Sequence, residues 1–185
     1  MKKLFLIVSL LAMMMVTGAV VAAPVNVNFS SLVTSFNITL PLTYNLDGIT
    51  FSYDNFATAS ETAAINPQGI AGSTYGALIF DFAAPATALN FNFTLNGAAG
   101  NPADALTAIF DNGDSATIPD GVGALAYTGA PFSNAQFFFA VNAAGAPLQF
   151  TVSNLSYEPV PEPGSMVALI SIIPTCLVAL KRKRS

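Results

Sequence analysis

The sequence predicts an all-β protein: an antiparallel β-sandwich of jelly-roll type, between an N-terminal signal peptide and a C-terminal transmembrane helix. Two observations predict the sandwich. Apolar and polar residues alternate in short runs across residues 23–159, and no run there keeps a helical apolar period. Phenylalanine is expected to fill the core, because fourteen of the fifteen phenylalanines lie in this segment.

The first 22 residues have the pattern of a secretory signal peptide. Two lysines open the chain, an apolar run follows, and small residues precede Ala23. We expect the secretory translocon to export the chain and signal peptidase to cut between Ala22 and Ala23. The alternative is an uncleaved membrane helix.

Short strands are expected at regular spacing through residues 23–159. The expected strands are 25–29, 36–40, 49–53, 76–82, 89–95, 106–110, 115–118, 136–141 and 148–157. Residues 60–74, which contain Asn66-Pro67 and two glycines, are expected to form a long loop. Residues 96–104, 119–123 and 128–134 are expected to be turns or connections.

Charge is sorted along the chain and excludes several functions. All six basic residues lie in the two terminal segments, and of the ten acids only Glu162 lies there, so residues 23–159 carry nine acids and no cation. A segment without Lys or Arg cannot neutralise phosphates, which excludes nucleic-acid binding. Without His, and with the single cysteine at Cys176, the usual general base and thiol nucleophile are missing. We therefore expect no enzyme.

Three residues in one turn are candidate calcium ligands. Carboxylate and amide oxygens suit calcium in an acidic extracellular loop. The candidates are Asp111, Asn112 and Asp114. A β-hairpin turn explains the same residues without metal, because Asp-Asn-Gly-Asp is common turn chemistry. No other cofactor is expected.

Residues 160–185 have three parts in a fixed order. A stiff proline segment is followed by an uncharged apolar run over 165–180 and then by a basic tail. At about 1.5 Å per residue the run spans about 24 Å as a helix, slightly less than a bilayer core of about 30 Å. The proline segment is Val160-Pro161-Glu162-Pro163, and the tail is Lys181-Arg182-Lys183-Arg184. Clustered Lys and Arg stay in the cytoplasm, so residues 23–159 are expected on the other side of the membrane.

This order of motif, apolar run and basic tail resembles the PEP-CTERM sorting signal of exported bacterial proteins. The resemblance implies that an exosortase recognises residues 160–163 outside the inner membrane while the helix holds the precursor. Processing would then release the protein to the cell surface or the extracellular space. The departure from the pattern is Pro174, which would kink the helix. The alternative is a plain single-pass anchor.

A second resemblance concerns the end of the β-segment. Residues 150–157 are similar to the final strand of carbohydrate-binding-module jelly rolls, which often carries an Asp-Asp or Asp-Asn pair. This chain has Ser153-Asn154 there, which departs from the pair and from its structural calcium site.

The sequence thus predicts a non-enzymatic surface or extracellular-matrix protein, sorted at its PEP motif and associated with exopolysaccharide or biofilm. The alternative function is a glycan- or calcium-binding module of the cell surface. A hydrolase is a third hypothesis, which the missing His, Lys, Arg and Cys oppose.

Overall fold

The chain folds into antiparallel β-strands with one short 3-10 helix, as the computed structural model shows for residues 22–56, 60–96, 104–142 and 144–161. All pairings between named strands are antiparallel, which confirms the predicted all-β antiparallel class. These residues form one compact unit, Ala23–Val160. The elements are β1 (Val25–Asn26), η1 (Phe29–Ser31), β2 (Phe36–Asn37), β3 (Tyr44–Leu46), β4 (Ile49–Asp54), β5 (Ala63–Asn66), β6 (Gly69–Ser73), β7 (Ala77–Asn96), β8 (Leu106–Phe110), β9 (Ser115–Ile118), β10 (Val122–Phe139) and β11 (Gln149–Pro159).

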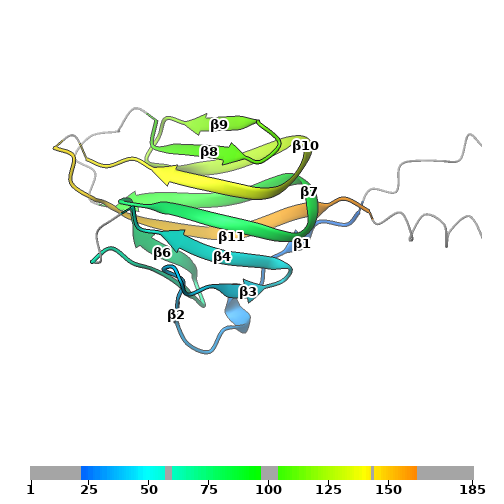
Figure 1. Ribbon diagram of the computed structural model, residues 1–185, viewed down its shortest axis with the longest axis horizontal. Coiled ribbons are helices and arrows are strands. Elements are labelled where there is room, and N and C mark those ends of the chain that lie inside the picture. Colours follow the sequence, from blue (N-terminus) through cyan, green and yellow to red (C-terminus); the bar gives the residue numbers. More distant parts are fainter. Residues whose placement is uncertain (1–21, 57–59, 97–103, 143, 162–185) are drawn as a thin grey trace, which may run out of the picture. The chain divides into compact units, whose positions relative to one another are not determined.

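Two strands, β7 and β10, are much longer than the rest and run beside each other along their whole length. Residues 77–81 of β7 pair with 134–138 of β10, and residues 88–94 pair with 122–128. The register shifts between Thr128 and Asn134, where both strands bend. Figure 1 shows β7 and β10 curving back at the same end of the domain. We call this pair the bent ribbon.

The bent ribbon contributes to two layers of strands. In the first layer, the first half of β7 lies between β4 and the last part of β10. This part of β10 pairs with β8, and β8 pairs with β9. In the second layer, the second half of β7 lies between β11 and the first part of β10. Beyond β11 the strands follow in the order β6, β5 and β2, each paired with the one before. We call the layer with β3, β4, β8 and β9 the first layer, and the layer with β2, β5, β6 and β11 the second layer.

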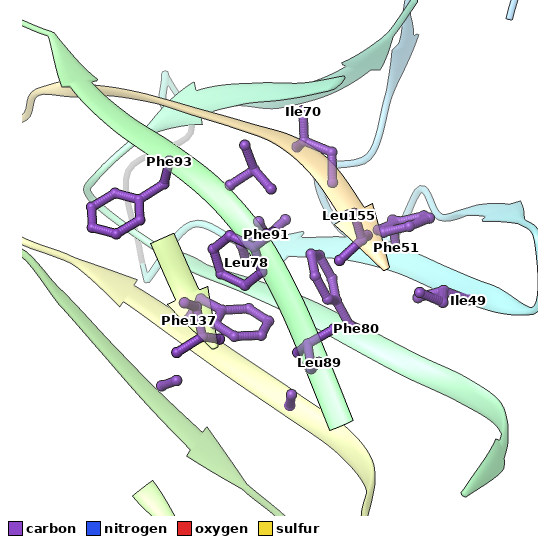
Figure 2. Close-up of a cluster of buried hydrophobic side chains, with 14 of the residues drawn as sticks. Ile49, Phe51, Ile70, Leu78, Phe80, Leu89, Phe91, Phe93, Phe137 and Leu155 are labelled. Atoms are coloured by element: carbon purple, nitrogen blue, oxygen red, sulfur yellow. The ribbon is translucent and has the colours of Figure 1, made fainter. Parts of the chain in front are cut away.

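The core lies between these layers and is built from aromatic rings. Phe80, from the first half of β7, and Phe91, from its second half, have ring centroids 6.2 Å apart. Both rings contact Phe137 of β10, at 4.7 Å and 5.1 Å. Figure 2 shows the three rings within one cluster of buried side chains. Two residues of one strand can meet across a core in this way only because the strand bends between them.

The bend corrects two expectations from the sequence. Residues 76–82 and 89–95 were expected as separate strands and 128–134 as a turn, whereas β7 and β10 are each continuous. Each strand carries a proline at the bend, Pro85 in β7 and Pro131 in β10. A proline lacks the N–H that a ladder needs, so it weakens the pairing at the bend and resembles a turn in the sequence.

The expected loop at 60–74 is also wrong, because it contains the β5–β6 hairpin. The glycines that suggested a loop are needed for close packing. A Cβ on Gly69 would lie 2.0 Å from the Val152 carbonyl oxygen, and one on Gly72 would lie 2.6 Å from the Ala63 Cβ. Only glycine lets β6 approach its neighbours this closely.

The ends of the domain meet at one place. β1 pairs with the end of β11, with Val25 opposite Tyr157. The expected strand 25–29 is thus shorter than predicted and continues into the 3-10 helix. Similarly, only Phe36–Asn37 of the expected strand 36–40 is extended in a ladder. The last backbone bond at this end joins the Val160 N–H to the Pro85 carbonyl oxygen at 2.7 Å.

Two tyrosines connect distant segments of the chain through their hydroxyl groups. The fully buried Tyr53 donates to the Ser73 carbonyl oxygen at 2.8 Å, and Tyr157 donates to the Asp47 carbonyl oxygen at 2.8 Å. Burial raises the pKa of Tyr53 from 10.0 to about 12. Burial is also the main cause of the raised pKa values of Tyr127 and Tyr157. Folding therefore favours the neutral phenols.

We predict that the domain loses stability in alkaline solution. Since the folded pKa values lie above the unfolded value of about 10, the stabilisation is fully present below pH 10 and is lost as the pH rises toward 12. Urea unfolding between pH 8 and 12 measures this slope. Tyr53→Phe should unfold at lower urea at pH 8, because the Ser73 carbonyl loses its donor, but its slope above pH 10 should be shallower. Equal slopes for the two proteins would contradict the assignment.

Candidate functional site

The predicted calcium ligands lie in the turn between β8 and β9. Phe110 and Asp114 close this turn through a 3.0 Å bond from the Phe110 N–H to the Asp114 carbonyl oxygen. Gly113 has a φ of 92°, a conformation that favours glycine. The Asn112 side-chain oxygen accepts the Asp114 N–H at 2.9 Å. The hairpin explanation of these residues is therefore realised in the fold.

The same side chains also reach across to the bend of β10. Each polar residue of the turn bonds to at least one residue of that strand, and Asn112 Nδ2 also donates to the Tyr127 hydroxyl oxygen at 2.9 Å. We call this set of contacts the turn clamp. In it the Ser133 N–H donates to Asp111 Oδ1 at 3.0 Å, Asn112 Nδ2 donates to the Ala130 carbonyl oxygen at 2.7 Å, and the Tyr127 hydroxyl donates to Asp114 Oδ2 at 2.5 Å. The Tyr127 ring stacks on Phe110 at 3.9 Å, which fixes its hydroxyl over the turn.

The turn clamp gives these residues a structural role that needs no metal. The carboxylates of Asp111 and Asp114 each accept from a different part of β10, so calcium would have to compete with these donors. Among the described residues no group of three or more His, Cys, Asp or Glu side chains could hold a metal ion. Calcium binding by Asp111, Asn112 and Asp114 stays a prediction.

The second resemblance of the sequence falls on a backbone irregularity. Asn154 has a φ of 52°, and the register between β11 and β7 shifts from Ser153 to Ser156. Asparagine tolerates this left-handed conformation better than most residues. Ser153-Asn154 therefore forms a β-bulge in the second layer.

Only the beginning of the predicted sorting motif belongs to the described residues. Val160 and Pro161 follow β11 directly. Glu162, Pro163, the predicted transmembrane helix 165–180 and the basic tail Lys181–Arg184 lie outside the described residues. Within the described ranges, no helix is long and apolar enough to cross a membrane.

A polar face that was not predicted covers the outside of the first layer. Side chains alternate along each strand, so Asn134, Gln136 and Phe138 of β10 point away from the buried Phe137. Asp81 of β7 lies opposite both Thr50 and Asn134 and accepts a 2.6 Å bond from Asn134 Nδ2. We call these residues the outer face: Thr50, Asp81, Asn134, Gln136 and Phe138.

An exposed ring extends this outer face. Phe56 follows β4, is 54% exposed, and lies parallel to Phe138 with ring centroids 5.9 Å apart and planes 7° apart. Its φ of 42° is unusual for a bulky residue. The alternation Asn-x-Gln-x-Phe at 134–138 was the one signal for this face in the sequence. It could not be used without knowing which strands lie beside β10.

Comparisons with known proteins give structural similarity only. No model of a known protein family matches the chain, and no curated protein matches it. A carbohydrate-binding module of family 29 is similar with a TM-score of 0.37 and 14% identity, over 68% of this chain and 88% of that one. A mutant family 29 module complexed with mannohexaose has a TM-score of 0.36 and 15% identity, over 68% of this chain and 91% of that one. Another mutant, complexed with cellulohexaose, has a TM-score of 0.36 and 17% identity, over 75% of this chain and 92% of that one. Similarity at this level assigns no function to this chain.

We predict that the turn clamp stabilises the bend of β10 without calcium. Tyr127→Phe keeps the ring stack on Phe110 but removes the hydroxyl, and should lower the free energy of unfolding by about 1–2 kcal/mol. The change should be the same in EDTA and in calcium. Thermal or urea unfolding measures it.

The same measurement tests the calcium prediction. If the turn binds calcium, added calcium raises the unfolding midpoint of the wild type beyond a sodium control of equal ionic strength, and Asp111→Asn removes that gain. A loss of stability in Tyr127→Phe that appears only with calcium would contradict the metal-free clamp.

Proposed function

We propose that this chain is an exported, non-enzymatic surface or extracellular-matrix protein, sorted and processed at Val160–Pro163. Its folded part would be a β-sandwich, of jelly-roll type, displayed outside the inner membrane. The translocon, signal peptidase and an exosortase would be its processing partners. An exopolysaccharide would be its partner in the matrix.

The observation that carries this proposal is the position of the end of the fold. The last backbone bond of the domain is made by Val160, the first residue of the motif, and the prolines of the motif begin at the next residue. The ladder of β11 ends at Pro159, and Pro161 has no N–H with which to continue it, so Pro161-Glu162-Pro163 would extend past the folded unit. A processing enzyme could thus bind the motif without unfolding the domain.

The spacing also sets where the domain would lie before processing. Ser165, the start of the predicted transmembrane run, is the fifth residue after Val160. At about 3.4 Å per extended residue this segment reaches at most about 17 Å. The domain would therefore stay close to the membrane surface until the motif is cut, and release would free it for the matrix.

Glycan binding is the second candidate function. The outer face supports it, since it places the exposed ring of Phe56 and the half-buried ring of Phe138 beside amide, hydroxyl and carboxylate groups. Ligand sites usually join apolar or aromatic surface to a few placed polar groups. A matrix protein that binds a glycan would combine both candidate functions in one molecule.

Processing of the full-length protein tests the main proposal. In a host with an exosortase, the intact mass of the surface form should lack Lys181–Ser185. Glu162→Ala should give a longer form that stays with the membranes. Glu158→Ala is the matched control, because it removes the same side chain four residues upstream and should be processed like the wild type. A surface form that still carries Lys181–Ser185 would contradict the proposal.

A further inference from the structure

We propose that the outer face of the first layer binds a neutral glycan chain, with Phe138 and Phe56 as the stacking surface. Asn134, Gln136 and Asp81 would supply hydrogen bonds to its hydroxyl groups. This inference rests on the glycan-binding candidate above and adds the position of the site and the charge class of its ligand.

The ring pair is the first observation for this site. A phenylalanine that is 54% exposed adds little to the core, yet Phe56 is held in a left-handed conformation that bulky residues rarely adopt. Such outliers concentrate at binding sites. Because its ring lies parallel to Phe138, the two side chains together offer apolar surface to the faces of sugar rings.

The polar groups are arranged in rows beside the rings. Thr50, Asp81 and Asn134 lie opposite one another across three strands. Gln136 lies opposite Ile109 of β8, and Phe138 lies opposite Thr107 in the next row. Neighbouring strands are about 4.8 Å apart, so the rows cross β4, β7, β10 and β8 over about 14 Å. That surface suits an extended chain better than a single small molecule.

Charge decides the class of glycan. The outer face carries the carboxylate of Asp81, and no residue of 23–160 is Lys, Arg or His. Uronate or sulfate groups would meet negative charge with no cation nearby, whereas neutral sugars would not. A second copy of the chain is also a poor occupant, since pairing two outer faces would bring their Asp81 carboxylates together.

A different apolar patch gives a matched control. Phe36 is 38% exposed, and its ring stacks on that of Tyr44 with centroids 4.6 Å apart; Leu40 and Leu42 of the intervening segment are exposed too. It has a similar ring pair, but its rings come from β2 and β3 and neither belongs to the outer face. If any exposed ring pair bound sugar, loss of Phe36 would matter as much as loss of Phe138.

Calorimetric titration of the full-length protein tests the proposal, in a polyoxyethylene detergent that carries no sugar. The probes are mannohexaose, cellulohexaose and an anionic galacturonate hexamer. We expect at least one neutral hexamer to bind, and Phe138→Ala and Phe56→Ala each to weaken that binding at least tenfold. Phe36→Ala should bind like the wild type, and the anionic hexamer should bind at least tenfold more weakly.

Other outcomes overturn the inference. Absence of binding to both neutral hexamers, equal or tighter binding of the anionic hexamer, or wild-type affinity in both Phe138→Ala and Phe56→Ala would each do so. Phe138→Tyr should retain binding, because it keeps an aromatic ring at this position. The unfolding midpoint of every variant is also measured, so that loss of the ring can be told from misfolding. The processing result does not depend on these titrations, so either proposal can fail alone.

Discussion

The strands β7 and β10 hydrogen-bond to each other on both sides of a bend, so one ribbon supplies strands to two layers. The aromatic core follows from this bend, because it brings Phe80 and Phe91 of the same strand together, each against Phe137. The turn clamp lies over the bend of β10, and the Val160 N–H bonds to Pro85 at the bend of β7. The end of the domain and the position of the proline motif thus depend on the same feature.

The absence of cations from residues 23–160 decides how the rest of the domain is stabilised. No ion pair between side chains can form there, so buried polar groups must use neutral donors. Tyrosine hydroxyls and asparagine amides take this role, and among the described residues no buried side-chain nitrogen or oxygen lacks a partner. The same absence limits what the outer face can attract, which is why a neutral ligand fits it.

The sequence predicted the local structure better than the topology. Alternation identified residues 89–95 and 106–110 as strands, because one face of each is buried. It could not show that 89–95 continues a strand that begins at Ala77, since Pro85 looks like a break. Gly69 and Gly72 looked like a loop for a similar reason, although close packing requires them. The candidate turn was found in the sequence, but its partners on β10 and the rows of the outer face depend on register between distant strands.

Hydrogen exchange on the full-length protein tests the bent ribbon most directly. If one ribbon joins both layers into a single cooperative unit, the amides of Phe80 and Phe91 should exchange only through global unfolding, with the same opening free energy. That free energy should equal the free energy of unfolding measured in urea. Tyr127→Phe should lower the opening free energy of both amides by the same amount. Exchange of one half of β7 through a separate opening of lower free energy would contradict the account.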